Sequence, residues 1–236
     1  MKEKIYQGSS KALYQIENES SLIMSFNDCF KIKEDKTIEI PGKGVLNNHL
    51  SSFLMNKLNS IGIETHFIEK VNMREQIIYF ADIVPIKIAI ASVACGRYHE
   101  ECGIENGYVF NKPMIDFIIK NNKKYPVINE EQLITLKWLS REEIEELKEK
   151  ALRIYDCLTG IFISRNIRLV ELMLEFGVMF NGDQFLVILT DEISFDNSRL
   201  WDASTNDKLS FEMIEDGNSK QVIKTYQDVL TRLNIE

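Results

Sequence analysis

Apolar and polar residues alternate in short stretches over the first ninety positions, a period-two pattern that is typical of β-strands. These stretches lie around residues 5–14, 22–26 and 76–80. Between them, apolar residues recur at helical spacing over positions 46–61, which predicts a helix there. The first part of the chain is therefore expected to fold as antiparallel strands with one helix.

A second group of strands is expected from residue 84 onwards. Isoleucine occupies every second position from Ile86 to Ile90, which predicts a strand with one buried face. Two alternating apolar runs, residues 167–180 and 184–192, flank Asn181-Gly182-Asp183 and predict a β-hairpin.

Two more helices are expected in the second half of the chain. Ser140 and Glu143 have the spacing of a capping box, and the helix that they begin carries apolar residues at helical spacing as far as Ile161. Another amphipathic pattern spans residues 222–233. Strands and helices occur in blocks and not in strict alternation, which predicts an α+β fold with mainly antiparallel sheets.

Composition limits the classes of function. The chain has 236 residues, a length that fits one large domain or two small subdomains. Its 28 Lys and Arg residues against 36 Asp and Glu residues give a net charge of −8, which argues against a nucleic-acid-binding protein. The four cysteines form no C-x-x-C pair, so neither a zinc ribbon nor a thioredoxin-like redox site is expected. With no signal-peptide pattern and no apolar run of about 18 residues, the protein is expected to be cytoplasmic, without membrane association.

The predicted hairpin carries candidate metal ligands. Glu171 and Glu175 project from the same face of its first strand, and Asp191 lies near the end of the second. If the loop is odd in length and centred on Asp183, Glu175 faces Asp191 at about 5 Å and a Mg²⁺ ion can neutralise the pair. A two-residue turn at positions 181 and 182 instead places the two carboxylates on opposite faces, each merely solvated. The spacing leaves both alternatives open.

Two other segments are candidates for binding anions. The turn Gly8-Ser9-Ser10-Lys11 lies between two strands and can cover phosphates with its backbone N–H groups and the lysine. It lacks the spacing of a P-loop, so an ordinary turn is also compatible with it. Arg199, in a polar segment after the hairpin, can hold a phosphate or carboxylate through two hydrogen bonds, or simply form a surface ion pair.

Several motifs, taken in order along the whole chain, resemble the SAICAR synthetase family. The last two are the most specific. The motifs are Ile5-Tyr6-x-Gly8-x-x-Lys11-x-x-Tyr14, Gly42-Lys43-Gly44-x-Leu46-Asn47-Asn48, Gly62-Ile63-x-Thr65-His66-Phe67, Val84-Pro85, Leu174-Glu175-Phe176-Gly177, and Asp191-Glu192-Ile193-Ser194-x-Asp196-x-Ser198-Arg199-Leu200-Trp201-Asp202.

The resemblance implies both a fold and an activity. The fold is α+β, related to kinases and ATP-grasp enzymes, with subdomains at residues 1–83 and 84–236 and a nucleotide cleft between them. The activity is that of an ATP-dependent ligase of purine biosynthesis. It joins L-aspartate to the carboxylate of 5-amino-1-(5-phosphoribosyl)imidazole-4-carboxylate through an acyl phosphate, and SAICAR is the product. ATP and Mg²⁺ are the implied cofactors, and a homodimer is the implied assembly.

The resemblance also implies roles for individual residues. Glu175 and Asp191 hold Mg²⁺ and act in catalysis together with Lys120, which lies near the nucleotide. The residues implied to bind the nucleotide are Gly8, Lys11, Ile83 and Val84. The residues implied to bind the substrates are Asp28, Lys43, Arg97 and Arg199.

The chain departs from the family pattern mainly at basic positions. Residues of other types stand where the family has lysine or arginine, at Ser9, Ala91, Glu100, Glu101, Met173 and Phe211. Arg97 can replace the absent arginine at the ribonucleotide phosphate, and Lys31 or Lys87, the latter in place of a family glutamate, can supply charge elsewhere. Two hypotheses follow: an active ligase with a rearranged phosphate site, or a catalytically degenerate paralogue that binds a nucleotide or a partner.

Overall fold

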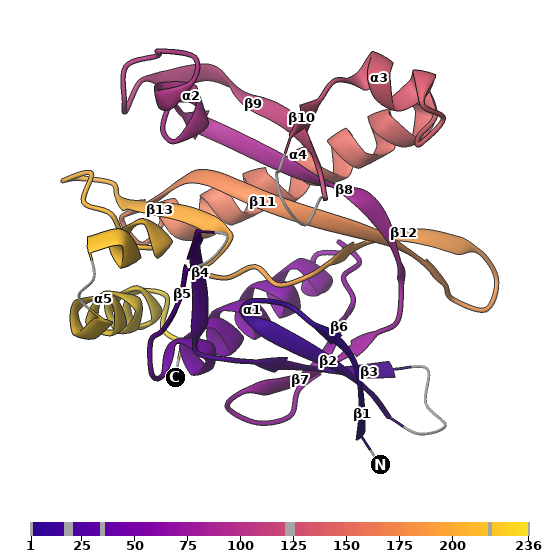
Figure 1. Cartoon of the computed structure of the whole chain (residues 1–236), viewed down its shortest axis with the longest axis horizontal. Coiled ribbons are helices and arrows are strands. Elements are labelled where there is room, and N and C mark those ends of the chain that lie inside the picture. The colour runs from indigo at the N-terminus through magenta and orange to yellow at the C-terminus, as the bar shows by residue number, and fades with distance from the viewer. Residues whose placement is uncertain (1, 17–20, 34–35, 121–125, 217–218, 236) are drawn as a thin grey trace.

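The computed structural model describes residues 2–16, 21–33, 36–120, 126–216 and 219–235. Two antiparallel sheets dominate it, one in the lower half and one in the upper half of Figure 1. This arrangement confirms the predicted α+β class. Within the described ranges, no helix is both long and apolar enough to span a membrane.

The first sheet contains the strands near the amino terminus. Its strand order is β1 (Lys2–Gln7), β2 (Lys11–Ile16), β3 (Ser21–Phe26), β7 (Glu75–Tyr79) and β6 (Phe67–Lys70). A separate two-stranded sheet pairs β4 (Cys29–Lys33) with β5 (Lys36–Glu39). The predicted helix is α1 (Lys43–Ser60), which contacts β3, β6 and β7. Its Leu50, Leu54 and Leu58 are fully buried in the main hydrophobic core.

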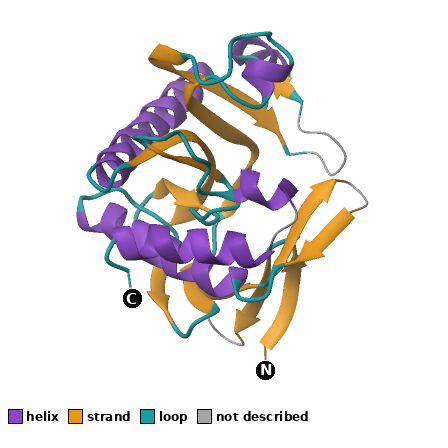
Figure 2. Cartoon of the chain, turned by 90° about the vertical axis from the view of Figure 1, so that its left-hand side faces the viewer, coloured by secondary structure: helices purple, strands orange, loops and turns teal. Residues whose placement is uncertain are grey.

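The second sheet is larger and includes the predicted hairpin. Its strand order is β10 (Val127–Ile128), β9 (Val109–Ile119), β8 (Asp82–Val93), β11 (Ile167–Phe180) and β12 (Phe185–Thr190), and β13 (Ser198–Asp202) also pairs with β11. The remaining helices are α2 (Arg97–Glu100), α3 (Glu130–Thr135), α4 (Arg141–Ile163), the 3₁₀ helix η1 (Phe211–Asp216) and α5 (Ser219–Arg232). Helix α4 packs on β8 and β11, and α5 lies beside α1 (Figure 2).

The central strand β8 is more buried than its alternating pattern predicts. Ile86, Ile88 and Ile90 are buried as expected, but Ala89 and Ala91 on the opposite face are buried too. The prediction of a single buried face is therefore wrong for this part of β8. The reason is that the second face is covered as well, because Ala91 belongs to an apolar cluster with Ala94 and with Tyr98 of α2.

The division into subdomains at residues 1–83 and 84–236 remains a prediction. The first sheet ends with β7 at Tyr79, and β8 of the second sheet begins at Asp82. Helix α5, however, belongs to the second predicted subdomain and contacts α1 of the first. The carboxy-terminal helix therefore joins the two halves.

The hairpin register differs from both alternatives that the sequence left open. Glu175 pairs with Thr190 and Phe180 pairs with Phe185, so Glu175 does not face Asp191 across the ladder. The turn is centred between Gly182 (φ +104°) and Asp183, because the side chain of Asn181 accepts hydrogen bonds from the N–H groups of Asp183 and Gln184, each at 3.0 Å. The predicted direct pairing of Glu175 with Asp191 is therefore wrong by one residue.

The capping box at the start of α4 leads to a test of stability. The Ser140 hydroxyl accepts from the Glu143 N–H at 3.2 Å, and the Glu143 carboxylate accepts from the Ser140 N–H at 2.7 Å. Ser140→Ala is expected to lower the free energy of unfolding by about 1 kcal/mol, because one helix N–H loses its partner. Urea titration checks this, with Ser164→Ala at the other end of α4 as the control. Equal stability of the two variants would contradict the prediction.

Candidate active site

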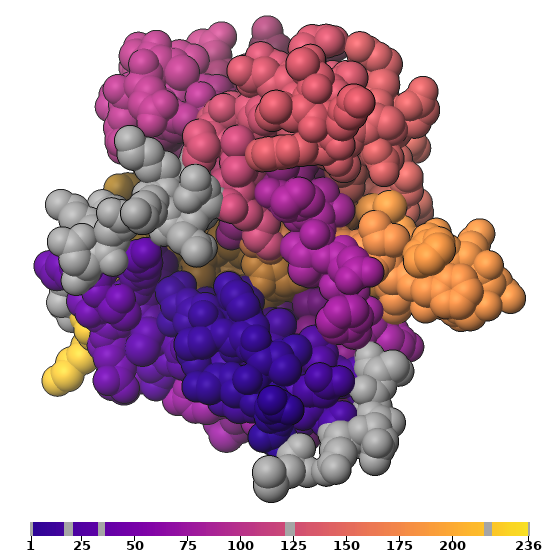
Figure 3. All heavy atoms as spheres, turned by 45° about the vertical axis from the view of Figure 1, so that its right-hand side comes forward, coloured from indigo at the N-terminus to yellow at the C-terminus, as the bar shows by residue number. Residues whose placement is uncertain are grey.

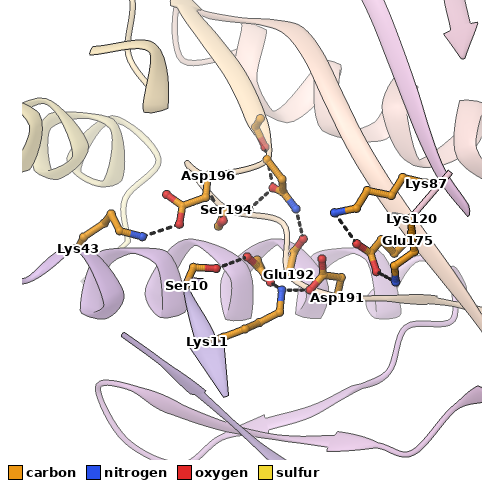
Figure 4. Close-up of polar contacts among 12 residues, drawn as sticks. Ser10, Lys11, Lys43, Lys87, Lys120, Glu175, Asp191, Glu192, Ser194 and Asp196 are labelled. Atoms are coloured by element: carbon orange, nitrogen blue, oxygen red, sulfur yellow. Dashed lines mark hydrogen bonds and ion pairs between the residues drawn. The ribbon is translucent and has the colours of Figure 1, made fainter. Parts of the chain in front are cut away.

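Lysines and carboxylates from both sheets meet where β12 ends (Figure 4). These side chains come from the strands β2, β8 and β11, from the residue after β9 and from the segment after β12. The cluster consists of Lys11, Lys87, Lys120, Glu175, Asp191 and Glu192. It brings together four residues for which the sequence predicted a catalytic or nucleotide-binding role.

Lys11 connects the amino-terminal sheet to the end of the hairpin. The turn before it is held by a hydrogen bond from the Gly8 N–H to the Lys11 carbonyl at 2.9 Å. The Lys11 ammonium contacts the carboxylates of Asp191 and Glu192. Burial lowers the pKa of Lys11, while the nearby negative charge of Glu175 opposes this shift. The predicted phosphate-covering turn therefore lies directly over the predicted metal ligands.

Glu175 is a buried but ionised carboxylate. Its Oε1 lies 2.7 Å from the Nζ of Lys87, and its Oε2 contacts the Nζ of Lys120. Burial alone would raise the pKa of Glu175, but attraction to Lys87, Lys120 and Lys11 outweighs burial and lowers that pKa to about 2. Glu175 therefore presents a full negative charge at neutral pH.

Asp191 combines backbone strain with burial. Its φ of +65° lies in the left-handed region, which costs a residue other than glycine on the order of 1–3 kcal/mol. Such strain often occurs at functional positions. Burial raises the pKa of Asp191, and its contact with the Lys11 ammonium favours the charged form. The ring of His66 is buried as well, and burial lowers the pKa of His66 to about 3.

The donor set of the cluster fits a magnesium ion that binds together with a nucleotide. Over the ranges that the structure describes, no three His, Cys, Asp or Glu side chains are grouped closely enough to hold a metal on their own. Mg²⁺ commonly takes only one or two carboxylates and completes its shell with water and phosphate oxygens. The Lys11 ammonium lies between Asp191 and Glu192, so the negative charge there already holds a cation. Glu175 and Asp191 remain the predicted ligands.

Ile83 and Val84, predicted to border the adenine, lie at the start of β8 near the same cluster. Ile83 is 49% exposed and pairs with Gly177, two residues beyond Glu175 on β11. The Lys120 N–H donates to the Pro85 carbonyl at 3.3 Å, which places the end of β9 beside this segment. Figure 3 shows a recess between the indigo strands of the first sheet and the pink part of the second, with darker orange atoms inside it.

Arg199, on β13, lies in a second polar group. Its Nε lies 2.6 Å from Glu171, and its Nη1 lies 2.8 Å from Glu212. The guanidinium also covers the ring of Phe211, with its centre 4.8 Å from the ring centroid. A Cβ atom at Gly96 would approach Nη2 to 2.8 Å, so only glycine leaves room for this arrangement. Two carboxylates and an aromatic ring therefore fix the orientation of Arg199.

Arg97 and Lys43, the other predicted substrate ligands with positive charge, each form an ion pair. Arg97 contacts Asp116, which also accepts from the Tyr98 hydroxyl at 2.7 Å. Lys43 is fully buried and contacts Asp196. Asp196 follows Phe195, whose ring stacks on Tyr226 of α5 at a centroid distance of 3.8 Å and so anchors this segment.

Asp28 lies apart from both groups. Its carboxylate accepts two hydrogen bonds from Arg74, at 2.8 and 2.9 Å, and two more from the N–H groups of Gly42 and Gly44, at 3.1 and 2.9 Å. These contacts fix the start of α1. The predicted substrate-binding role of Asp28 stays a prediction, and its contacts in the structure are those of a residue that stabilises the fold.

Asp28→Asn is expected to lower the free energy of unfolding at pH 7 by about 1.5–3 kcal/mol, because hydrogen bonds to a charged acceptor are lost. Burial raises the pKa of Asp28, but Arg74 and the two backbone donors lower it below the ordinary value of 3.8. Its stabilising contribution is therefore complete above pH 3.8 and is lost as the pH falls through the lower folded-state pKa. Denaturant titration of both proteins from pH 7 to pH 3 checks this, and a difference that grows on acidification would contradict it.

Two acidic residues of these groups were not predicted as site residues. Glu192 contacts Lys11, and Glu212 contacts Arg199 and accepts from the Trp201 indole N–H at 2.8 Å. The adjacent acids Asp191-Glu192 could have indicated Glu192 from the sequence. No local pattern indicated Glu212, because its partners lie on β13 and are brought near by the tertiary fold.

Comparisons with known proteins identify the family of this chain. The family model for SAICAR synthetase matches residues 4–233. The phosphoribosylaminoimidazole-succinocarboxamide synthase of Rickettsia massiliae (strain Mtu5) is 53% identical over 234 residues, covering 99% of each chain. The crystal structure of the synthase of that name from Ehrlichia chaffeensis has 37% identity, a TM-score of 0.94 and 99% coverage of both chains. A type-2 SAICAR synthetase in complex with ADP has 31% identity, a TM-score of 0.89, and coverage of 97% of this chain and 96% of its own. The chain thus belongs to the SAICAR synthetase family.

Proposed function

We propose that this protein is the ATP-dependent ligase that joins L-aspartate to the carboxylate of 5-amino-1-(5-phosphoribosyl)imidazole-4-carboxylate and yields SAICAR. The main support is the 53% identity to a synthase of that name over 99% of both chains. The cluster around Glu175 supplies what a phosphoryl transfer needs, namely oxygen ligands for a metal and lysines for the phosphates.

The proposed reaction has two steps. A carboxylate oxygen of the ribonucleotide attacks the γ-phosphorus of ATP, the bond to the β-phosphate oxygen breaks, and ADP leaves. The aspartate amine then attacks the carbon of the acyl phosphate, phosphate leaves with that carboxylate oxygen, and the amine gives up a proton. Catalysis of this kind depends mostly on positioning and on neutralising charge.

The residues of the chain divide these tasks. Bound Mg²⁺ supplies charge neutralisation at the phosphates, and Glu175 and Asp191 are its ligands in this proposal. Lys11 and Lys120 place positive charge beside the transferring group, with Gly8, Ile83 and Val84 at the nucleotide. The orientation of Arg199, set by Glu171 and Glu212, suits it to the ribonucleotide phosphate. Arg97 and Lys43 are further substrate ligands in this proposal.

The alternative of a catalytically degenerate paralogue is not favoured. It rested on positions where the family has a basic residue and this chain does not, such as Ser9 and Met173. Close relatives of this chain nevertheless carry the synthase name. In the structure, Lys87 lies beside Glu175 and adds a positive charge to the cluster. The cytoplasmic location, the homodimer and the absence of nucleic-acid partners remain predictions.

A reconstituted assay tests the proposal. Purified protein with ATP, Mg²⁺, aspartate and the ribonucleotide is expected to release ADP and to form SAICAR in equal amounts. Omitting aspartate or the ribonucleotide is expected to stop SAICAR formation. Intact binding of ADP without any product formation would favour the non-catalytic alternative.

A further inference from the structure

Lys87 lies on the same face of the second sheet as Glu175. The two residues are register partners on β8 and β11, and Lys87 Nζ lies 2.7 Å from Glu175 Oε1. The side chain of Lys87 is 24% exposed, so its ammonium reaches the surface of the cluster and is not sealed in the core. Asp116 and Glu171, the next charged residues along this face, pair with Arg97 and Arg199. Lys87 therefore places its positive charge beside Glu175 and not beside these acids.

The positive and negative charges of the cluster are equal in number only while no ligand is bound. Three ammonium groups, Lys11, Lys87 and Lys120, lie against three carboxylates, Glu175, Asp191 and Glu192. A divalent cation bound by Glu175 and Asp191 would neutralise the carboxylates that now hold the lysines. The ammonium of a lysine is carried on a flexible four-carbon stem, so it can move to a new acceptor without any change in the backbone.

The polyphosphate of a nucleotide is the acceptor that such lysines suit. Each phosphate oxygen takes a charge-assisted hydrogen bond, and an ammonium group can contact several oxygens. Lys87 and Lys120 contact the two oxygens of the same Glu175 carboxylate, so their ammonium groups lie close together. The same pair of lysines can therefore contact one bound anion.

We propose that Lys87 is a further nucleotide-binding residue of this enzyme, which exchanges the Glu175 carboxylate for a phosphate oxygen of the bound nucleotide. The inference rests on the proposed function, since it concerns the same site. It assigns to Lys87 a contact with the phosphates, beyond its ion pair with Glu175.

Nucleotide binding at saturating Mg²⁺ tests this assignment. Binding of ADP and of adenosine is measured by calorimetry in excess Mg²⁺, for the wild-type protein and for Lys87→Met. The Kd for ADP is expected to rise about tenfold in the variant, while the Kd for adenosine stays unchanged, because only ADP has phosphates for Lys87 to contact. Lys87→Arg is expected to recover most of the affinity for ADP. Lys112→Met, which removes an exposed lysine on β9, is the control and is expected to bind ADP like the wild type.

The other outcomes overturn the assignment. If Lys87 only balances the charge of Glu175, Lys87→Met binds ADP as tightly as the wild type or more tightly. An equal loss of ADP and adenosine binding would indicate a structural role. Either result leaves the proposed function intact if the wild-type protein still makes SAICAR. A wild-type protein that neither binds ADP nor makes SAICAR would overturn both proposals.

Discussion

Replacing Asp191 with asparagine is expected to lower kcat/KM for SAICAR formation on the order of 10³-fold while the protein stays folded. Loss of one preorganised charged group at such a site costs about 10²–10³-fold, and Asp191 both faces Lys11 and is a predicted metal ligand. Asparagine tolerates the left-handed backbone at φ +65° better than most residues, so the change removes charge and leaves the turn in place. Steady-state kinetics over a range of Mg²⁺ concentrations measures the effect.

A matched variant separates the local effect of charge from a general one. Asp183→Asn makes the same substitution at the exposed tip of the same hairpin and is expected to leave kcat/KM unchanged. Asp191→Asn should also need more Mg²⁺ for half-maximal rate. Near-normal activity of Asp191→Asn at low Mg²⁺ would contradict the metal-binding role.

Arg199→Met is expected to lower the free energy of unfolding by about 3–5 kcal/mol and to abolish measurable ligation. The Arg199 side chain is 20% exposed and is the ion-pair partner of both Glu171 and Glu212. Removing it leaves two poorly solvated carboxylates close together, and breaking a buried charge network in this way is strongly destabilising. Guanidinium titration followed by Trp fluorescence measures the stability.

Two further variants test the cause of that loss. Arg168→Met removes an arginine of β11 whose guanidinium donates a hydrogen bond to Asn206 at 3.2 Å, and little change is expected. Adding Glu171→Gln to Arg199→Met should recover part of the lost stability, because one of the unpaired charges is removed. A double variant less stable than Arg199→Met would show that charge imbalance is not the cause.

Much of the fold could be predicted from local patterns. The apolar spacing of Leu50, Leu54 and Leu58 predicted α1, and the Ser140 capping box predicted the start of α4. These features succeed because each depends on contacts within a few residues. The motifs that carry the family resemblance likewise contain Lys11, Glu175 and Asp191, and the resemblance implied a role for Lys120. The structure brings these four residues together.

The details that the sequence did not yield depend on geometry beyond local spacing. The hairpin register was decided by the Asn181 side chain, which shifted the turn by half a residue relative to the predicted centre at Asp183. The burial of Ala91 depends on its apolar cluster with Ala94 and Tyr98, which tertiary packing brings together. The contact of Glu212 with Arg199 joins η1 to β13, and the sequence of neither segment alone predicts it.

Transfer of an oxygen atom tests the proposed ligation most directly. The ribonucleotide is supplied with ¹⁸O in its carboxylate, and the phosphate released during SAICAR formation is analysed by mass spectrometry. Attack of the carboxylate on the γ-phosphorus predicts one ¹⁸O atom in each phosphate released by the wild-type protein. Release of unlabelled phosphate, or no phosphate release from a protein that still binds ADP, would contradict the account.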